Sequence, residues 1–148
     1  METILEVVRI EQIIREVDER VNYTIRSPKD GAEIASRFIG RDDREVFFVM
    51  CLNTKNSVVA VHRCHVGSLN SSLAHPREVF KSAILNNSSS IILAHQHPSG
   101  DVVPSPEDIH VTKRLVDAGK LLGIEVLDHL IVNSFGRFTS LKEKGHII

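Results

Sequence analysis

The sequence predicts an α/β domain, because strand-type and helix-type segments follow one another along the chain without an internal repeat. Short runs of β-branched and apolar residues, such as 46–52 and 58–66, are typical of buried strands. Other segments begin with Ser-Pro or Pro, and the longest of these, 105–122, is followed by a glycine. With 148 residues, 42% of them hydrophobic, the chain suffices for one domain with a sizeable core.

The N-terminal segment, residues 1–24, is predicted separately from the globular domain, residues 25–148. Its apolar residues between positions 4 and 21 have a spacing compatible with a helix, although the stretch 8–10 could instead open a strand. Both alternatives stay open at this point.

The first half of the domain is predicted to hold a helix and a β-hairpin. The helix starts at Ser27-Pro28, runs to residue 39 and ends at Gly40. The strands 46–52 and 58–66 follow, and the polar connection between them is a hairpin signal.

The second half is predicted to alternate helices and strands. Pro76 opens a helix through residue 85, and an Asn- and Ser-rich stretch separates it from a buried strand at 91–94. The helix 105–122 precedes the strand 124–132, and a short strand at 138–141 closes the sheet.

A metal site is predicted where the strand 91–94 ends. His95 and His97 lie two residues apart, so in a strand both rings point to the same face. Ten residues separate His97 from Asp108, which the first turn of a helix starting at Ser105 would bring back as a third ligand. Two imidazoles and one carboxylate with an open position form the ligand set of a catalytic zinc.

Each of these residues also has a simpler interpretation. Ser105 is a good helix N-cap and Asp108 a good capping-box partner. Either histidine alone is typical of a hydrogen-bonded side chain at a strand end. Packing explains the combination poorly, however, and the metal site is therefore the favoured hypothesis.

The His-x-His, ten residues, Asp pattern, with Ser three positions before the Asp, resembles the JAMM motif of the JAB/MPN zinc metallopeptidases. The bacterial RadC branch of that family is more similar still over residue 25 to the C-terminus. The resemblance rests on seven segments: IRSPKDG (25–31), LNTKN (52–56), GSLNSS (67–72), HPREVF (75–80), HQHPSGD (95–101), PSPED (104–108) and LDHLIV (127–132). It implies a mixed β-sheet with flanking helices, of the cytidine-deaminase-like type.

The sequence departs from typical RadC proteins at two places. Typical RadC proteins carry a helix-hairpin-helix region before this domain. In this sequence only some two dozen residues precede the segment that resembles RadC, so we expect that DNA-binding element to be absent or cut away. Gln96 stands between the histidines, where Asn is usual. A residue between two ligands on a strand points to the other face, so this difference leaves the predicted metal site intact.

The resemblance also implies roles for two further residues. JAMM enzymes use an upstream glutamate as general base, and Glu45, directly before the strand 46–52, fits that position. Its alternative is a solvated residue at a strand end, and Glu107 and Glu78 are less well placed as bases. The serine of the motif, Ser105, would hydrogen-bond the substrate carbonyl or the tetrahedral oxygen, a role that competes with helix capping without excluding it.

Other metal-ligating residue types have weaker patterns. His62 and Cys64 share a strand face, so a soft-metal site is conceivable, but no second cluster accompanies them. We expect Cys51 and Cys64 to be reduced thiols. Asp128 and His129 face opposite ways on a strand, yet either could be a partner of a ligand histidine.

Charge and hydropathy restrict the partners and the location. The formal net charge of −1 provides no global attraction to phosphate, so we expect no strong nucleic-acid binding. No segment suits a bilayer span, and Glu2 and Glu6 interrupt any signal-like start, so we expect a cytoplasmic domain without membrane contact.

The favoured hypothesis is therefore a zinc-dependent hydrolase of peptide or isopeptide bonds, with one Zn²⁺ on His95, His97 and Asp108 and a peptide or protein substrate. The main alternative is a DNA-repair-associated accessory module with a non-catalytic zinc site. A third is a subunit interaction module, which the intact ligand set disfavours.

Overall fold

The computed structural model describes residues 2–17, 23–68 and 74–148, and its centre is a mixed sheet with flanking helices, as predicted. The five strands run in the order β2-β1-β3-β4-β5. In chain order, the elements are α1 (Pro28–Ile39), β1 (Val46–Leu52), β2 (Val58–Val66), α2 (Pro76–Val79), α3 (Lys81–Leu85), β3 (Ser90–Gln96), α4 (Pro106–Leu122), β4 (Glu125–Val132) and β5 (Phe138–Ser140).

Strand directions decide which ends meet. β1 is antiparallel to both β2 and β3, whereas β3 and β4 are parallel and are connected through α4. The antiparallel register pairs Phe47, near the start of β1, with His95, near the end of β3. The first residues of β1 and the last residues of β3 therefore share one edge of the sheet.

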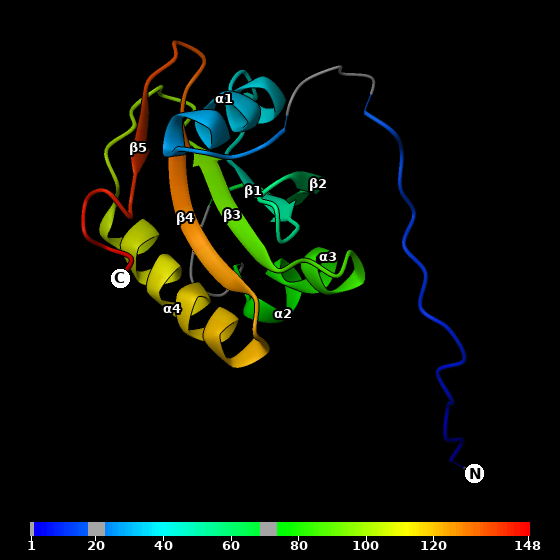
Figure 1. Cartoon of the computed structure of the whole chain (residues 1–148). Helices are drawn as coiled ribbons and strands as arrows, with labels where there is room; N and C mark the ends of the chain where they lie inside the picture. The colour runs from blue at the N-terminus through cyan, green and yellow to red at the C-terminus, as the bar shows by residue number, and fades with distance from the viewer. Residues whose placement is uncertain (1, 18–22, 69–73) are drawn as a thin grey trace.

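Helices cover both faces of the sheet (Figure 1). α1 packs on one face, where its apolar side chains meet Phe48, Met50 and Leu130. α2, α3 and α4 pack on the other face, against Phe47 and Leu93 among others. Every residue of β1 and β3 is buried, as expected for central strands covered on both sides.

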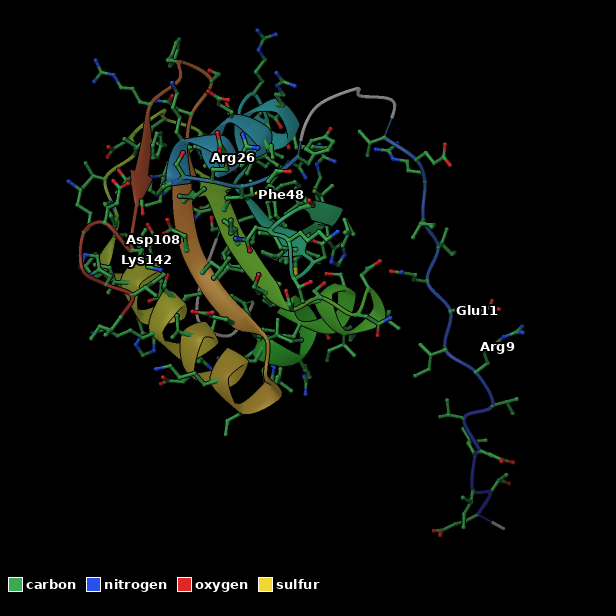
Figure 2. The ribbon with its side chains drawn as sticks, viewed as in Figure 1. Arg9, Glu11, Arg26, Phe48, Asp108 and Lys142 are labelled. Atoms are coloured by element: carbon green, nitrogen blue, oxygen red, sulfur yellow. The ribbon has the colours of Figure 1, made fainter. Side chains whose placement is uncertain are left out.

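The helix and the strand considered for the N-terminal segment are both wrong for residues 2–17. Residues 2–17 form neither helix nor strand, and their apolar side chains are exposed (Figures 1 and 2). Arg9 and Glu11 pair with each other at 2.8 Å, and Gln12 exchanges amide hydrogen bonds with Asn86. An isolated helix needs an apolar face buried on a partner, and this segment buries none here. Residues 18–21 of the segment considered for a helix, and 69–72 of the GSLNSS segment, lie outside the described residues.

The helix predicted from Pro76 through residue 85 is two short helices, α2 and α3. They meet at Phe80, whose ψ of −5° departs from the helical value of roughly −42°. The Phe80 side chain is 1% exposed and belongs to the core on the α4 face. Burial of this ring thus accompanies the interruption.

Within the described ranges, no helix combines the length and the apolar character that a membrane span requires.

Candidate metal centre

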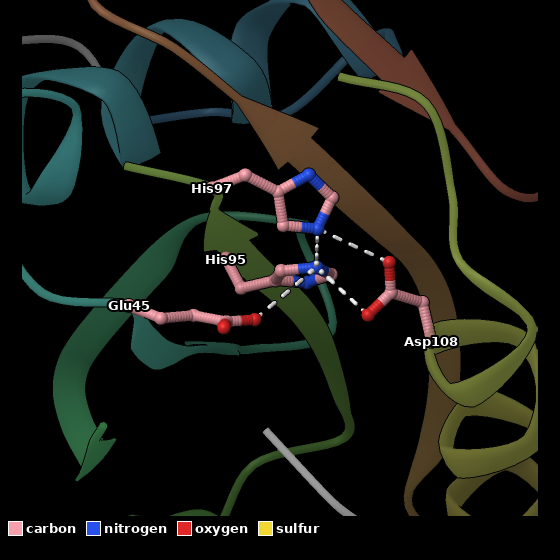
Figure 3. Close-up of side chains that lie close together, drawn as sticks. All are labelled: Glu45, His95, His97 and Asp108. Atoms are coloured by element: carbon pink, nitrogen blue, oxygen red, sulfur yellow. Dashed lines mark hydrogen bonds and ion pairs between the residues drawn. The ribbon is translucent and has the colours of Figure 1, made fainter. Parts of the chain in front are cut away.

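Four of the predicted residues meet where β1 begins, β3 ends and α4 begins. Glu45, His95, His97 and Asp108 each offer one ligand atom, and these atoms all lie within 4.8 Å of one another. In Figure 3 the carboxylates of Glu45 and Asp108 approach the His95 ring from opposite sides. Three segments far apart in the sequence therefore contribute to one cluster.

The two histidines direct the same ring nitrogen to the centre of the cluster. His95 Nε2 lies 3.2 Å from His97 Nε2 and 3.2 Å from Asp108 Oδ1, and His97 Nε2 lies 3.2 Å from Asp108 Oδ2. His97 Nδ1 is 2.8 Å from the Asp101 carbonyl oxygen, which can only accept a hydrogen bond. In the neutral ring, the His97 proton is thus on Nδ1, and the Nε2 lone pair faces the cluster.

Asp108 is held rigidly at the start of α4. Its backbone N–H donates to Ser105 Oγ at 3.0 Å, and its Oδ2 accepts from the Ser105 N–H at 2.8 Å, which makes a complete capping box. Burial by itself would raise the pKa of Asp108. The neighbouring rings of His95 and His97, which can carry positive charge, and the N–H of Ser105 outweigh that effect and hold the pKa of Asp108 well below its usual range.

The cluster favours a positive charge at its centre. Asp108 raises the pKa of His97 despite partial burial, because only the protonated His97 ring can donate from Nε2 to the Asp108 carboxylate. An ionised carboxylate and two imidazole nitrogens that converge without a cation repel one another through their lone pairs. The donor set of two nitrogens and carboxylate oxygen is also one that zinc accepts, so the residues fit a zinc ion.

Glu45 reaches the cluster from the loop before β1. Its Oε1 lies 4.0 Å from His95 Nε2, and its side chain is 18% exposed. Gln96 determines the course of this loop from the opposite face of β3. Its Oε1 accepts from the Val46 N–H at 2.9 Å, and its Nε2 donates to the Arg44 carbonyl at 2.5 Å. The peptide groups on both sides of Glu45 are therefore fixed by one buried amide.

The structure places Ser105 in the helix cap, beside Asp108. As a cap the hydroxyl accepts a hydrogen bond, which uses a lone pair and leaves its hydrogen to be donated elsewhere. Its predicted contact with a substrate oxygen stays a prediction.

His129 is the member of the Asp128-His129 pair that touches a ligand histidine. Its Nε2 lies 2.7 Å from His95 Nδ1, its Nδ1 contacts Thr112 Oγ1, and burial lowers its pKa well below the usual value. Asp128 instead accepts from the Ser140 hydroxyl at 2.6 Å. Sequence patterns left this choice open, and Thr112 was not foreseen, because only the sheet register and the packing of α4 bring these residues together.

The soft-metal alternative loses support. Burial raises the pKa of Cys64 to about 11, so its thiol stays protonated at neutral pH and is a poor ligand. Cys51 and Cys64 are both free thiols. Among the described residues, the only group of three or more potential metal ligands is the one that contains Glu45.

Comparison with known proteins shows the family of this chain. A family model described as RadC-like JAB domain matches residues 25–146. The chain belongs to this family. JAB domains include hydrolases and often bind zinc.

Similar proteins from several bacteria are named UPF0758 proteins. A UPF0758 protein of Moorella thermoacetica is 60% identical over 121 residues, covering 82% of this chain and 52% of the relative. One from Caldanaerobacter subterraneus is 52% identical, covering 84% and 53%, and one from a Geobacillus species is 47% identical, covering 97% and 63%. This chain thus spans between half and two thirds of the length of these relatives.

Proposed function

We propose that this RadC-like JAB domain is a zinc-dependent hydrolase of peptide or isopeptide bonds. The observation that carries the proposal is the meeting of His95, His97 and Asp108 with a second carboxylate, Glu45, within 4.8 Å. A purely structural zinc site would be closed by four ligands, commonly thiolates, and would have no use for a partly exposed carboxylate beside it.

His95, His97 and Asp108 hold the metal ion in this proposal. Zinc, when bound, supplies an acidified water and a Lewis acid for the scissile carbonyl. The protein must then provide a base for the water proton and a donor for the developing oxyanion.

Glu45 is the proposed base. Its carboxylate takes the proton of the attacking water and passes it to the leaving amine, which requires contact with both the cluster and the substrate side. A side chain that reaches the cluster and is still 18% exposed satisfies that requirement. Ser105 is proposed to donate its hydroxyl hydrogen to the carbonyl oxygen while it continues to cap α4.

Zinc content is the first test of the proposal. Protein purified without chelator is expected to contain close to one zinc per chain, and His97→Ala is expected to lose most of it. A melting curve of the same variant controls for folding. If the wild-type protein is metal-free and takes up no added zinc, the proposed zinc site is wrong, and the proposed hydrolase with it.

Turnover is the second test. A library of peptides and lysine-linked isopeptides is incubated with the zinc-loaded chain, with chelator, and with chelator followed by excess zinc. Cleavage that chelator abolishes and zinc restores is the expected result. Stable zinc without any cleavage, together with a submicromolar, salt-resistant complex with DNA, would instead support the accessory-module alternative.

A further inference from the structure

A chain of three buried hydrogen bonds leads from α4 through β4 to His95. Thr112 Oγ1 donates to the Asp108 carbonyl oxygen at 2.7 Å. Thr112 Oγ1 also contacts His129 Nδ1 at 2.5 Å, and His129 Nε2 contacts His95 Nδ1 at 2.7 Å. Thr112, His129 and His95 are all 0% exposed, so water does not compete for these contacts.

The direction of each bond follows from counting hydrogens. A threonine hydroxyl has one hydrogen, and a carbonyl oxygen can only accept, so the hydrogen of Thr112 is used on Asp108. In the second contact Thr112 must therefore accept, and His129 must donate from Nδ1. The proton of a neutral His129 is thereby placed on Nδ1, and Nε2 is left as an acceptor.

The neutral form of His129 is the one its surroundings support. Its two nitrogens contact a hydroxyl oxygen and an imidazole nitrogen, and the Phe47 ring packs against it in a T-shaped arrangement with the centroids 5.5 Å apart. Neither hydrogen-bond partner is a carboxylate, and a charged ring in so apolar a position would be costly.

We propose that Thr112 and His129 form a positioning relay that keeps the proton of His95 on Nδ1, so that the Nε2 lone pair always faces the metal centre. Because His129 Nε2 accepts, His95 Nδ1 must be the donor in their contact. In the neutral His95 ring, the Nε2 then carries the lone pair, and it lies 3.2 Å from both Asp108 Oδ1 and His97 Nε2. A neutral imidazole without such a partner can carry its proton on either nitrogen, and only one of the two forms binds a metal through Nε2.

The relay rests on the metal-binding part of the proposed function, and its consequence is preorganisation. Partners that orient ligand histidines typically contribute about 10–100-fold to metal affinity. The usual partner is a carboxylate or a carbonyl oxygen. Here the partner is a second histidine, whose own proton is set by the threonine one helical turn after Asp108.

The direct test is the protonation state of the rings in the metal-free chain. Long-range proton–nitrogen NMR spectra of protein labelled with ¹⁵N-histidine distinguish protonated from unprotonated ring nitrogens. The relay requires Nδ1 to be protonated in both His95 and His129, and Nε2 to be unprotonated in His129. An unprotonated Nδ1 in His95, or a proton on Nε2 of His129, would overturn it, whatever the zinc content or activity of the protein.

The second test reverses the relay by mutation. Thr112→Val keeps the shape but removes the acceptor, so the His129 proton is expected to move to Nε2 and to displace the His95 proton onto its own Nε2. Zinc affinity, measured by competition with a chromogenic chelator, is expected to fall about 10–100-fold. Thr112→Ser retains the hydroxyl and is the matched control, with affinity near wild type.

These outcomes separate the relay from the proposed hydrolase. Wild-type affinity in a folded Thr112→Val chain contradicts the relay. Failure of the wild type to bind zinc contradicts the proposed function, and the NMR spectra of the metal-free chain then decide the relay alone. Zinc binding without hydrolysis leaves the relay supported and the hydrolase unsupported.

Discussion

The cluster has a buried side and an open side, and the two are held in different ways. The His95 and Asp108 side chains are 0% and 3% exposed and are fixed by buried side-chain contacts with β4 and within α4. His97 and Glu45 are 20% and 18% exposed, and each is attached through a neighbouring loop. The buried side is thus held by contacts within the protein, whereas the open side is partly accessible to solvent.

The largest effect is expected on the buried side, from Asp108→Asn. The asparagine oxygen can still accept from the Ser105 N–H, so the helix cap and the melting temperature should be largely retained. A neutral amide is, however, a poorer zinc ligand than a carboxylate. Zinc affinity should fall by more than the roughly 10–100-fold typical of losing an outer contact, and hydrolysis should disappear with it. Unchanged zinc content in Asp108→Asn would show that the buried side does not hold the metal.

On the open side, Glu45→Gln is expected to separate metal binding from catalysis. The amide has the same size but cannot take a proton, so turnover should drop by roughly 10²–10⁴-fold while zinc content and melting temperature stay near wild type. The two measurements must be made on the same preparation. Full activity would mean that the base is another residue, and loss of zinc would place Glu45 among the metal ligands.

The difference between the two sides also explains what sequence patterns could predict. The strands, α1 and α4 follow from local patterns of apolar residues and caps, and the His-x-His spacing fixes which face both rings share. The four cluster residues could be named for the same reason, together with the family resemblance. Their roles as ligands and base remain predictions.

Contacts that depend on sheet register could not be predicted. The face of Gln96 followed from strand alternation, but its partner Val46 is 50 positions away in the sequence. His129 could be named only as one of two choices, since the pairing of β3 with β4 decides which side chain meets His95. Residues 4–17 show the converse error, because helical spacing predicts a helix only where a partner covers the apolar face.

Ser105→Ala should have an effect of intermediate size and should lower both turnover and folding stability. Loss of one oxyanion contact costs about 10²–10³-fold in rate, and loss of the cap costs about 1 kcal/mol of folding stability. Ser105→Thr keeps the hydroxyl and the cap and serves as the control. If Ser105→Ala lowers the melting temperature but leaves turnover unchanged, the residue is a helix cap and nothing more.

The smallest effect on catalysis is expected from Gln96→Met, which acts on the open side from the far face of β3. Methionine has a similar length but makes none of the hydrogen bonds that fix the peptides around Glu45. Unpairing these buried groups should cost about 1–3 kcal/mol of stability, measured by denaturant unfolding. Because Gln96 points away from His95 and His97, zinc affinity should not change.

Turnover of Gln96→Met should fall on the order of tenfold, which corresponds to roughly 1.4 kcal/mol of barrier, because the Glu45 carboxylate samples more positions. Two comparisons of zinc-replete protein test whether Gln96 acts through Glu45. We expect Gln96→Met to be tenfold slower than wild type. The double variant Gln96→Met/Glu45→Gln should be as fast as Glu45→Gln alone. Additive losses would mean that the buried amide supports the site by another route.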